Sequence, residues 1–232
     1  MQYVKIKDSI VEQIESGMLS ARQKLPSERK LAESFDTTRV TLREALSLLE
    51  AEGRIYREDR RGWFISPVPL RYDPQQLVSF SMMAAAQNRT PSSLLLNAKA
   101  MLANKESSQL LGLAPFSDVF CINRVRCLES RPVAYITHYV RPELFPTLLD
   151  HDLSDSLTEV YRHHYATQYE QIRYRVSVSI LSGEVAQALR ATVGTPAMKI
   201  ERTHFDKQGQ TIDCQTEYWR HDVINIESHL RF

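Results

Sequence analysis

The stretch LPSERKLAESFDTTRVTLREAL, residues 25–46, decides the fold of the N-terminal part of the chain. From Leu42 onwards, leucine and alanine recur at helical spacing, so one face of the expected helix is apolar. The other face carries Arg39 and Arg43, which are four residues apart and therefore neighbours. Thr37 or Thr38 can cap the first turn, and the free amides and positive dipole end then face an anion. The stretch predicts a helix that presents hydroxyls and guanidiniums to a phosphate backbone.

The segments on both sides of this helix complete a recognisable pattern. Isoleucines at four-residue spacing before Gly17 indicate a first helix, and Ser27 can N-cap a second. The third helix should end at Gly53. Two short β-like runs, 54–56 and 63–65, then flank a charged turn. Three helices followed by a hairpin predict a winged helix-turn-helix.

The composition is that of a folded protein with two domains. The 232 residues are 43% hydrophobic and 25% charged, which is enough for a core and unlike a disordered chain. The first residues lack the apolar region of a signal peptide, and no run approaches about 18 apolar residues. We therefore expect a cytoplasmic protein with no membrane partner. Because the net charge is +1, any charge that binds nucleic acid must be arranged locally.

The cysteines show no sign of a metal site or a disulfide framework. Cys121, Cys127 and Cys214 follow neither a CxxC spacing nor a Cys/His zinc pattern. We interpret them as packed thiols and expect neither a metal nor a cofactor.

A proline-rich segment separates the first domain from a second of different character. Ser66-Pro67-Val68-Pro69 cannot continue a helix or a central strand. We predict a DNA-binding domain at 1–66, a linker at 67–74 and a second domain at 75–232. Period-two runs in that domain lie at 120–126, 133–140, 172–180, 198–205 and 211–219, with helical stretches near 152–161 and 183–191 and a hairpin turn at 207–210. This pattern predicts an antiparallel α+β domain.

The N-terminal residues resemble the DNA-binding signature of the GntR family. The resemblance rests on L-P-S-E-R at 25–29, L-A at 31–32, Phe35, R-x-T-x-R-x-A-L at 39–46 and Gly53, and it covers residues 4–66. It implies operator DNA contacts by Arg29, Thr38, Arg39, Thr41 and Arg43, with Arg61 and Gly62 at the tip of the wing. The alternative for an isolated R-x-x-x-R is a solvated helix face, which the preceding helix, the tight turn and the basic wing disfavour. Val40 and Asp36 vary among relatives and leave the operator sequence open.

The second domain is similar to the UTRA domain of the HutC subfamily, which has a chorismate lyase-like fold. GntR relatives carry an all-helical metal-binding domain, an aminotransferase-like domain or a UTRA domain. The chain is too short for the aminotransferase, and five strand-like runs conflict with the all-helical domain. The UTRA resemblance spans about residues 75–226 and rests on R-x-R at 124–126, R-P-V at 131–133, S-L at 156–157 and Y-W-R-H-D at 218–222.

Arg124 and Arg126 are the leading candidates for effector binding. Side chains alternate along a strand, so both guanidiniums share one face and repel each other unless an anion lies between them. Ser156 lies near an expected helix start and could complete a phosphate or carboxylate site. The resemblance implies that these residues hold an anionic group and that Asp213 meets the polar end of the ligand. The alternative is that the arginines pair with carboxylates on neighbouring strands.

Further candidates follow from the same resemblance and from strand periodicity. Glu217 and Trp219 should face the same way as Asp213. Related sugar-phosphate sensors carry a glutamate on the strand after Pro132, whereas this chain reads Y-I-T-H-Y at 135–139. The His138-Tyr139 pair resembles the phosphonate-utilisation branch. A histidine hydrogen-bonded within the core is the alternative for His138.

These features predict a homodimeric, ligand-responsive transcriptional regulator, expected to be a repressor, on a palindromic operator. The expected effector is a small anionic metabolite that carries phosphate or phosphonate. Three alternatives stay open: an enzyme of chorismate lyase-like fold, a regulator of either sign that senses a non-phosphorylated metabolite, and an architectural DNA-binding protein without a ligand. The sequence offers no nucleophile–base pair, so no catalytic residue is assigned.

Overall fold

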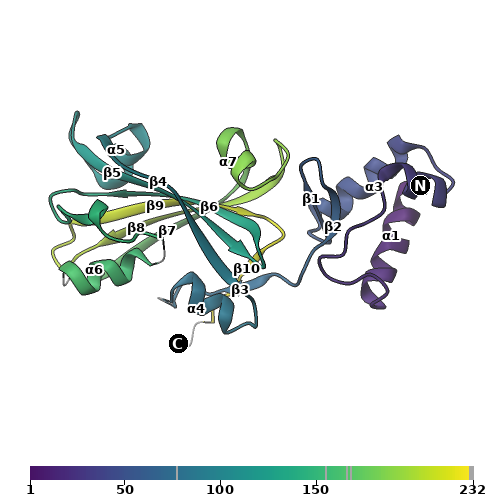
Figure 1. Cartoon of the computed structure of the whole chain (residues 1–232), viewed down its shortest axis with the longest axis horizontal. Coiled ribbons are helices and arrows are strands. Elements are labelled where there is room, and N and C mark those ends of the chain that lie inside the picture. Colours follow the sequence, from purple (N-terminus) through teal and green to yellow (C-terminus); the bar gives the residue numbers. More distant parts are fainter. Residues whose placement is uncertain (77, 155, 166, 168, 230–232) are drawn as a thin grey trace. The chain divides into compact units, whose positions relative to one another are not determined.

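The structure is a computed structural model that describes residues 1–76, 78–154, 156–165, 167 and 169–229. The chain forms two compact units: the first comprises Met1–Asp73, Ile180–Pro196 and the segment from Arg220, and the second comprises Pro74–Ser179 and Ala197–Trp219. The predicted second domain includes 180–196 and the residues after 220, whereas in the structure these segments pack in the first unit. Figure 1 shows both units, with most of their helices and strands labelled.

The N-terminal residues fold as the predicted winged helix-turn-helix. Its elements are α1 (Gln2–Glu15), α2 (Glu28–Ser34), α3 (Arg39–Ala51), β1 (Ile55–Glu58) and β2 (Gly62–Ile65). The core contains Leu42, Ala45, Leu46 and Leu49 of α3, all with no exposed surface, together with Ile6 and Ile10 of α1. The stripe inferred from the sequence is therefore the buried face of α3.

The helix starts follow from side-chain caps. Ser27 accepts a hydrogen bond from the Lys30 amide at 3.3 Å and begins α2. Thr38, rather than Thr37, caps α3 by accepting from the Thr41 amide at 3.2 Å. Each cap satisfies an amide that has no partner within its helix, which fixes where the helix begins.

The wing is a short antiparallel hairpin. β1 and β2 pair from Ile55 with Ile65 to Glu58 with Gly62, and the turn lies between them. Gly62 has φ +99°, a backbone conformation that side chains with a Cβ rarely adopt. Glycine at this position is therefore a requirement of the wing turn.

The predicted linker contains a strand. Residues 66–69 are irregular, as the prolines require, but β3 (Leu70–Tyr72) follows and pairs in parallel with β10 (Ile224–Ile226). Leu70 and Tyr72 are buried, so the segment does not behave as a simple spacer. This strand could not be predicted from the sequence, because three residues are too few to show periodicity.

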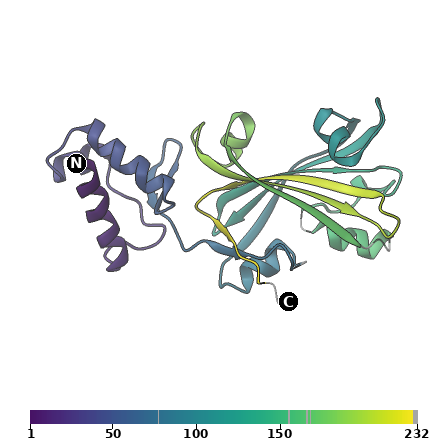
Figure 2. The same ribbon diagram turned by 180° about the vertical axis from the view of Figure 1, so that it is seen from behind.

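The second unit is built on a six-stranded sheet in the order β4-β5-β6-β9-β8-β7. Its strands are β4 (Pro91–Leu102), β5 (Asp118–Leu128), β6 (Arg131–Val140), β7 (Gln171–Ile180), β8 (Pro196–Phe205) and β9 (Thr211–Arg220). The pairings of β5 with β6 and of β6 with β9 are antiparallel, as predicted for this domain, and β4 also pairs with β5 in antiparallel fashion. Figure 2 shows the sheet from behind.

Helices cover both faces of this sheet, as both views show (Figures 1 and 2). α6 (Leu157–Tyr165) packs on the face that carries Phe120 and Ile122, and α5 (Lys105–Leu111) packs on the face that carries Val119 and Cys121. Because side chains alternate along β5, its even-numbered residues face α6 and its odd-numbered residues face α5. The effector candidates Arg124 and Arg126 continue the even-numbered series, on the α6 face.

Several helical elements differ from the expectation. The helix expected at 152–161 begins only at Leu157, because the Asp152 carboxylate accepts from the Ser154 amide at 2.9 Å and forms a local turn first. The helix expected at 183–191 is α7 (Gly183–Ala188), which ends before Arg190, a residue with φ +50°. The short helix α4 (Phe80–Ala85), as well as α5 and β4, was not predicted.

The remaining fold predictions concern thiols and membranes. All three cysteines are buried and none forms a disulfide, as predicted for packed thiols. None of the helices in the described part of the chain has the length and apolar content needed to cross a bilayer.

Candidate DNA-binding surface and effector site

The candidate DNA-binding residues of α3 lie at its N-terminal end and on its exposed side. Arg39 and Val40 are exposed, Val40 to 69%. The hydroxyls of Thr38 and Thr41 lie 3.1 Å apart, so the capping interaction orients both. An apolar side chain and a guanidinium at the start of a helix can meet a thymine methyl and a guanine edge.

Arg43 is held in place by the preceding helix. Its Nε donates to Oε2 of Glu28 at 2.8 Å, while the indole Nε1 of Trp63 donates to Oε1 of the same carboxylate at 3.2 Å. Burial would raise the pKa of Glu28, but the hydrogen bonds from Arg43 and Trp63 outweigh it and lower the pKa. The carboxylate therefore stays ionised and links α2, α3 and the wing.

The other DNA-binding candidates also lie at the surface. Arg29 is 65% exposed and forms an ion pair with Glu33 at 3.6 Å. In the wing, Arg61 pairs with the Glu58 carboxylate and lies over the Phe64 ring at 5.7 Å. The structure thus places every candidate on the winged helix, with the wing pair Arg61 and Gly62 at the turn of the hairpin.

On the α6 face of the sheet, Arg124 and His138 form the centre of the effector candidates. The Arg124 Nη2 lies 2.8 Å from the His138 Nε2, and its Nη1 donates to the Leu153 carbonyl at 3.4 Å, in the loop before α6. Burial, with a further contribution from Arg124, holds the pKa of His138 well below its usual range. A guanidinium can only donate, so the neutral imidazole accepts at Nε2 and carries its proton on Nδ1.

Asp213 belongs to a second group on the same face. Its Oδ2 accepts from the Tyr169 hydroxyl at 3.1 Å, and its Oδ1 meets Nδ1 of His204, whose ring stacks on Tyr169 with centroids 4.1 Å apart. Burial, reinforced by the charge of Asp213, raises the pKa of Tyr169 and of Tyr161 well above the usual value. Tyr169 therefore keeps its proton and donates it to the Asp213 carboxyl group.

Glu217 and Trp219 form the third group, next to Arg126. Glu217 is fully buried, pairs with Arg202 at 3.0 Å and accepts from the indole nitrogen of Trp219. The Arg126 guanidinium lies over the rings of Trp219, at 5.8 Å, and Phe80, at 5.1 Å. The predicted common orientation of Asp213, Glu217 and Trp219 agrees with their register against β6.

Ser156 stands apart from these contacts. It immediately precedes α6, and its carbonyl accepts from the amides of Glu159 and Val160. It lines a shallow pocket of about 210 Å³ with Asp152 and His163. Arg124 instead contacts the carbonyl of Leu153, which lies three residues before Ser156 in the sequence.

Sequence reasoning missed three polar residues of this cluster: Arg202, His204 and Tyr169. Arg202 and His204 are two residues apart on β8. The acids Asp213 and Glu217 lie on β9, the strand that follows the predicted hairpin turn. Pairing the two strands about that turn would have placed a base beside each acid. Tyr169 lies in a connection and left no periodic signal.

Comparison with known proteins agrees with both parts of the structure. The family model "Bacterial regulatory proteins, gntR family" matches residues 2–65, and the UTRA domain model matches residues 86–225, more than half of the chain. The chain belongs to the GntR family. Its second domain is a UTRA domain, so the fold expectation is confirmed.

Relatives of this GntR-family chain are named as transcriptional regulators. It is 29% identical over 221 residues to YihL of Escherichia coli K12, named as an uncharacterized HTH-type transcriptional regulator, covering 95% of this chain and 94% of that one. It is 29% identical over 220 residues to the HTH-type transcriptional repressor NagR of Bacillus subtilis, covering 95% and 90%. The GntR-family chain is therefore a transcriptional regulator and not an enzyme.

Solved structures share the fold. PhnF from Mycobacterium smegmatis superimposes with a TM-score of 0.67 at 20% identity, covering 97% of this chain and 99% of that one. YydK from Bacillus subtilis gives 0.61 at 20% identity over the whole of both chains. At this identity the likeness extends to the fold alone, and the phosphonate-type branch suggested by His138 and Tyr139 is not confirmed.

Proposed function

We propose that this regulator is a homodimeric repressor that leaves a palindromic operator when a small anion carrying phosphate or phosphonate binds beside Arg124 and Arg126. One observation carries the proposal. Both arginines stand on the α6 face of β5, and Arg124 reaches a neutral histidine and the loop before α6. Their charges are fixed at any physiological pH, whereas His138 adds none.

The donor set fits a tetrahedral dianion. Two guanidiniums can each offer paired N–H groups, and charge-assisted hydrogen bonds of this kind are stronger than neutral ones. The neutral His138 retains one N–H and can donate without adding a third positive charge. Ser156, which directly precedes α6, is the candidate for a further hydroxyl donor to the same anion.

Asp213 and Glu217 provide hydrogen-bond acceptors for another part of the ligand. Each carboxylate already accepts from neighbouring donors, Asp213 from Tyr169 and Glu217 from Trp219. A ligand hydroxyl or amine can join either group, because a carboxylate has about four acceptor positions. The expected ligand has an anionic group at the two arginines and an amine or hydroxyl at the two carboxylates. An aminophosphonate matches this description best, and a sugar phosphate comes next.

Dimerisation and a palindromic operator follow from the size of the DNA-binding part. A single α3 reaches only one half-site, and helix-turn-helix proteins obtain specificity from two half-sites related by two-fold symmetry. We assign the dimer contacts to the second domain, as expected from the sequence.

Calorimetry combined with gel shifts tests the proposal. Aminoethylphosphonate or a hexose phosphate should bind wild type and release operator DNA, and Arg126→Ala should abolish both effects without loss of folding. Lys207→Ala removes the same charge at an exposed turn and serves as the matched control. Release of DNA by a neutral ligand, with equal potency in wild type, Arg124→Ala and Arg126→Ala, would show that these arginines are structural and that the effector is not an anion.

A further inference from the structure

The face of the sheet that carries α5 holds a second groove, separate from the effector candidates. It has a volume of about 740 Å³ and is lined by residues of α5, β7 and β8. That volume lies within the range typical of small-molecule sites. Because α5 and α6 cover opposite faces, the groove and the cluster around Arg124 are divided by the sheet itself (Figure 1).

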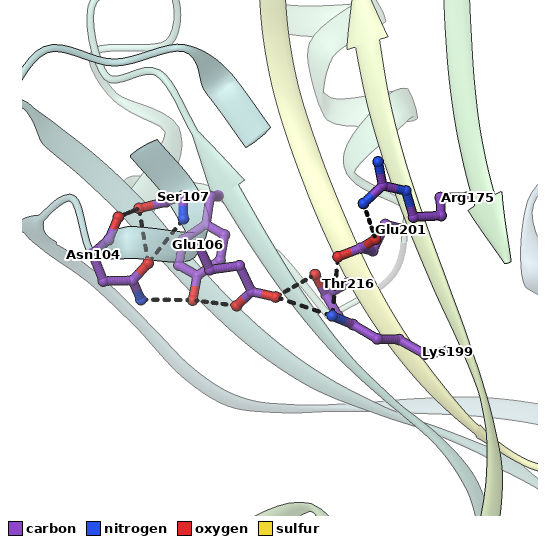
Figure 3. A network of polar contacts seen from close by, with 8 residues as sticks. Asn104, Glu106, Ser107, Arg175, Lys199, Glu201 and Thr216 are labelled. Atoms are coloured by element: carbon purple, nitrogen blue, oxygen red, sulfur yellow. Dashed lines mark hydrogen bonds and ion pairs between the residues drawn. The ribbon is translucent and has the colours of Figure 1, made fainter. Parts of the chain in front are cut away.

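A network of polar contacts links residues that line this groove, among them Glu106, Lys199 and Glu201 (Figure 3). Glu106 accepts from the Thr216 hydroxyl at 2.9 Å and lies 3.8 Å from the Lys199 amine, which in turn binds Glu201 at 3.0 Å. Burial lowers the pKa of Lys199, but its bond to Glu201 and the surrounding charges outweigh this and raise it. Lys199 is therefore charged and already neutralised by two carboxylates.

The rim of the groove carries further positive charges in addition to Lys199. Arg173 and Arg175 stand two residues apart on the edge strand β7, so both project on the α5 side, and Lys105 lines the groove from α5. Arg175 is 78% exposed and comes no closer than 3.7 Å to Glu201. Arg173 lies over the Phe205 ring at 5.4 Å. Four cationic and two acidic side chains line the groove, which leaves it with a net positive charge.

The spacing of these cations determines what they can hold. Residues i and i+2 of a strand are separated by about 7 Å, and here the two guanidiniums have different partners: Arg173 lies over the Phe205 ring, and Arg175 lies beside the Glu201 carboxylate. Each can therefore bind a group of its own bidentately. Glu106 and Glu201 can accept hydrogen bonds from hydroxyls between the two groups.

We propose that this groove is a second ligand site, which takes a small polyanion with two anionic groups, phosphate or carboxylate, held by Arg173 and Arg175. The site goes beyond the proposed effector function, because it uses none of the residues assigned to it. A regulator with two such sites can respond to two metabolites.

Titration calorimetry of the full-length protein at low ionic strength tests the site. The probes are inorganic pyrophosphate and citrate, which distinguish phosphate from carboxylate ligands. We expect one or both to bind wild type. Binding should fall by at least about tenfold in the double variant Arg173→Ala/Arg175→Ala, since each hydrogen bond to a charged group is worth more than tenfold in affinity.

Two controls isolate the groove. Lys99→Ala/Lys207→Ala removes the same charge at exposed positions outside it and should bind the probe as wild type does. Arg126→Ala should also retain binding, which separates this site from the effector cluster. Failure of both probes to bind wild type overturns the proposal, as does equal loss in both double variants. Light scattering that shows a changed oligomeric state only in Arg173→Ala/Arg175→Ala would assign the arginines to a subunit contact and likewise overturn it.

Discussion

Arg43 of α3 donates to the Glu28 carboxylate of α2 at 2.8 Å, so a side chain assigned to DNA is held by the helix that precedes it. The same carboxylate binds Trp63 of the wing. A guanidinium fixed in this way loses less conformational freedom when it meets a base than an unrestrained one. Arg39, by contrast, has no such side-chain contact within the part of the chain that the structure describes.

Arg39→Ala and Arg43→Ala should each weaken operator binding, by about 1–3 kcal/mol if the side chain makes a bidentate base contact. Gel-shift titrations at fixed salt measure the effect, with Glu44→Ala, on the same helix, as a control for helix stability. Wild-type affinity in both arginine variants, with folding intact, would remove α3 from the recognition role.

The neutral state of His138 predicts acid sensitivity. Its pKa is depressed in the folded state, so the unfolded chain takes up a proton below about pH 6.5 and the folded chain does not. The stability that the neutral ring contributes is present above that pH and is lost as the pH falls below it, by at most about 1.4 kcal/mol per pH unit. His138→Gln cannot titrate, and its melting temperature should fall less between pH 7 and pH 5 than that of wild type. Parallel profiles would refute the assignment.

The buried pair of Arg202 and Glu217 should matter for folding. Arg202→Ala leaves the fully buried Glu217 carboxylate without its cation, which should lower the free energy of unfolding by about 3 kcal/mol. Arg162→Ala breaks an exposed pair with Glu159 and should change it by less than about 1 kcal/mol. Urea unfolding of both variants compares the two, and similar midpoints would contradict the buried pairing.

The oligomeric state and the operator symmetry can be tested together. We expect the full-length protein to be a dimer by light scattering at micromolar concentration and to prefer a palindrome over an isolated half-site. The preference arises because two half-sites are bound by one dimer. A monomer, or equal affinity for both DNAs, contradicts the proposed assembly.

The sequence predicted the winged helix closely because its signals are local. Caps at Ser27 and Thr38, glycine stops and the stripe from Leu42 to Leu49 each act within a few residues. The effector cluster was predicted only in part, because its partners come from different strands. Arg124 and His138 are neighbours through the pairing of β5 with β6, whereas His204 and Tyr169 meet Asp213 only once the sheet and its connections have folded.

Weak or absent periodicity explains the elements that were missed. β4 is an edge strand with most of its side chains exposed and a bulge between Leu95 and Asn97, so it lacks the alternation of the central strands. α5 has seven residues, too few for a clear helical stripe.

The buried cysteines make the native protein a convenient host for spectroscopic labels. Cys121, Cys127 and Cys214 are at most 5% exposed, and burial raises the pKa of the Cys214 thiol well above its usual value. Thiol reagents attack thiolates that they can reach, so these three should react slowly. A single cysteine introduced at Arg60, which is 93% exposed in the wing, would then take up a spin label selectively. In a dimer, two such labels would report the wing-to-wing distance with and without ligand.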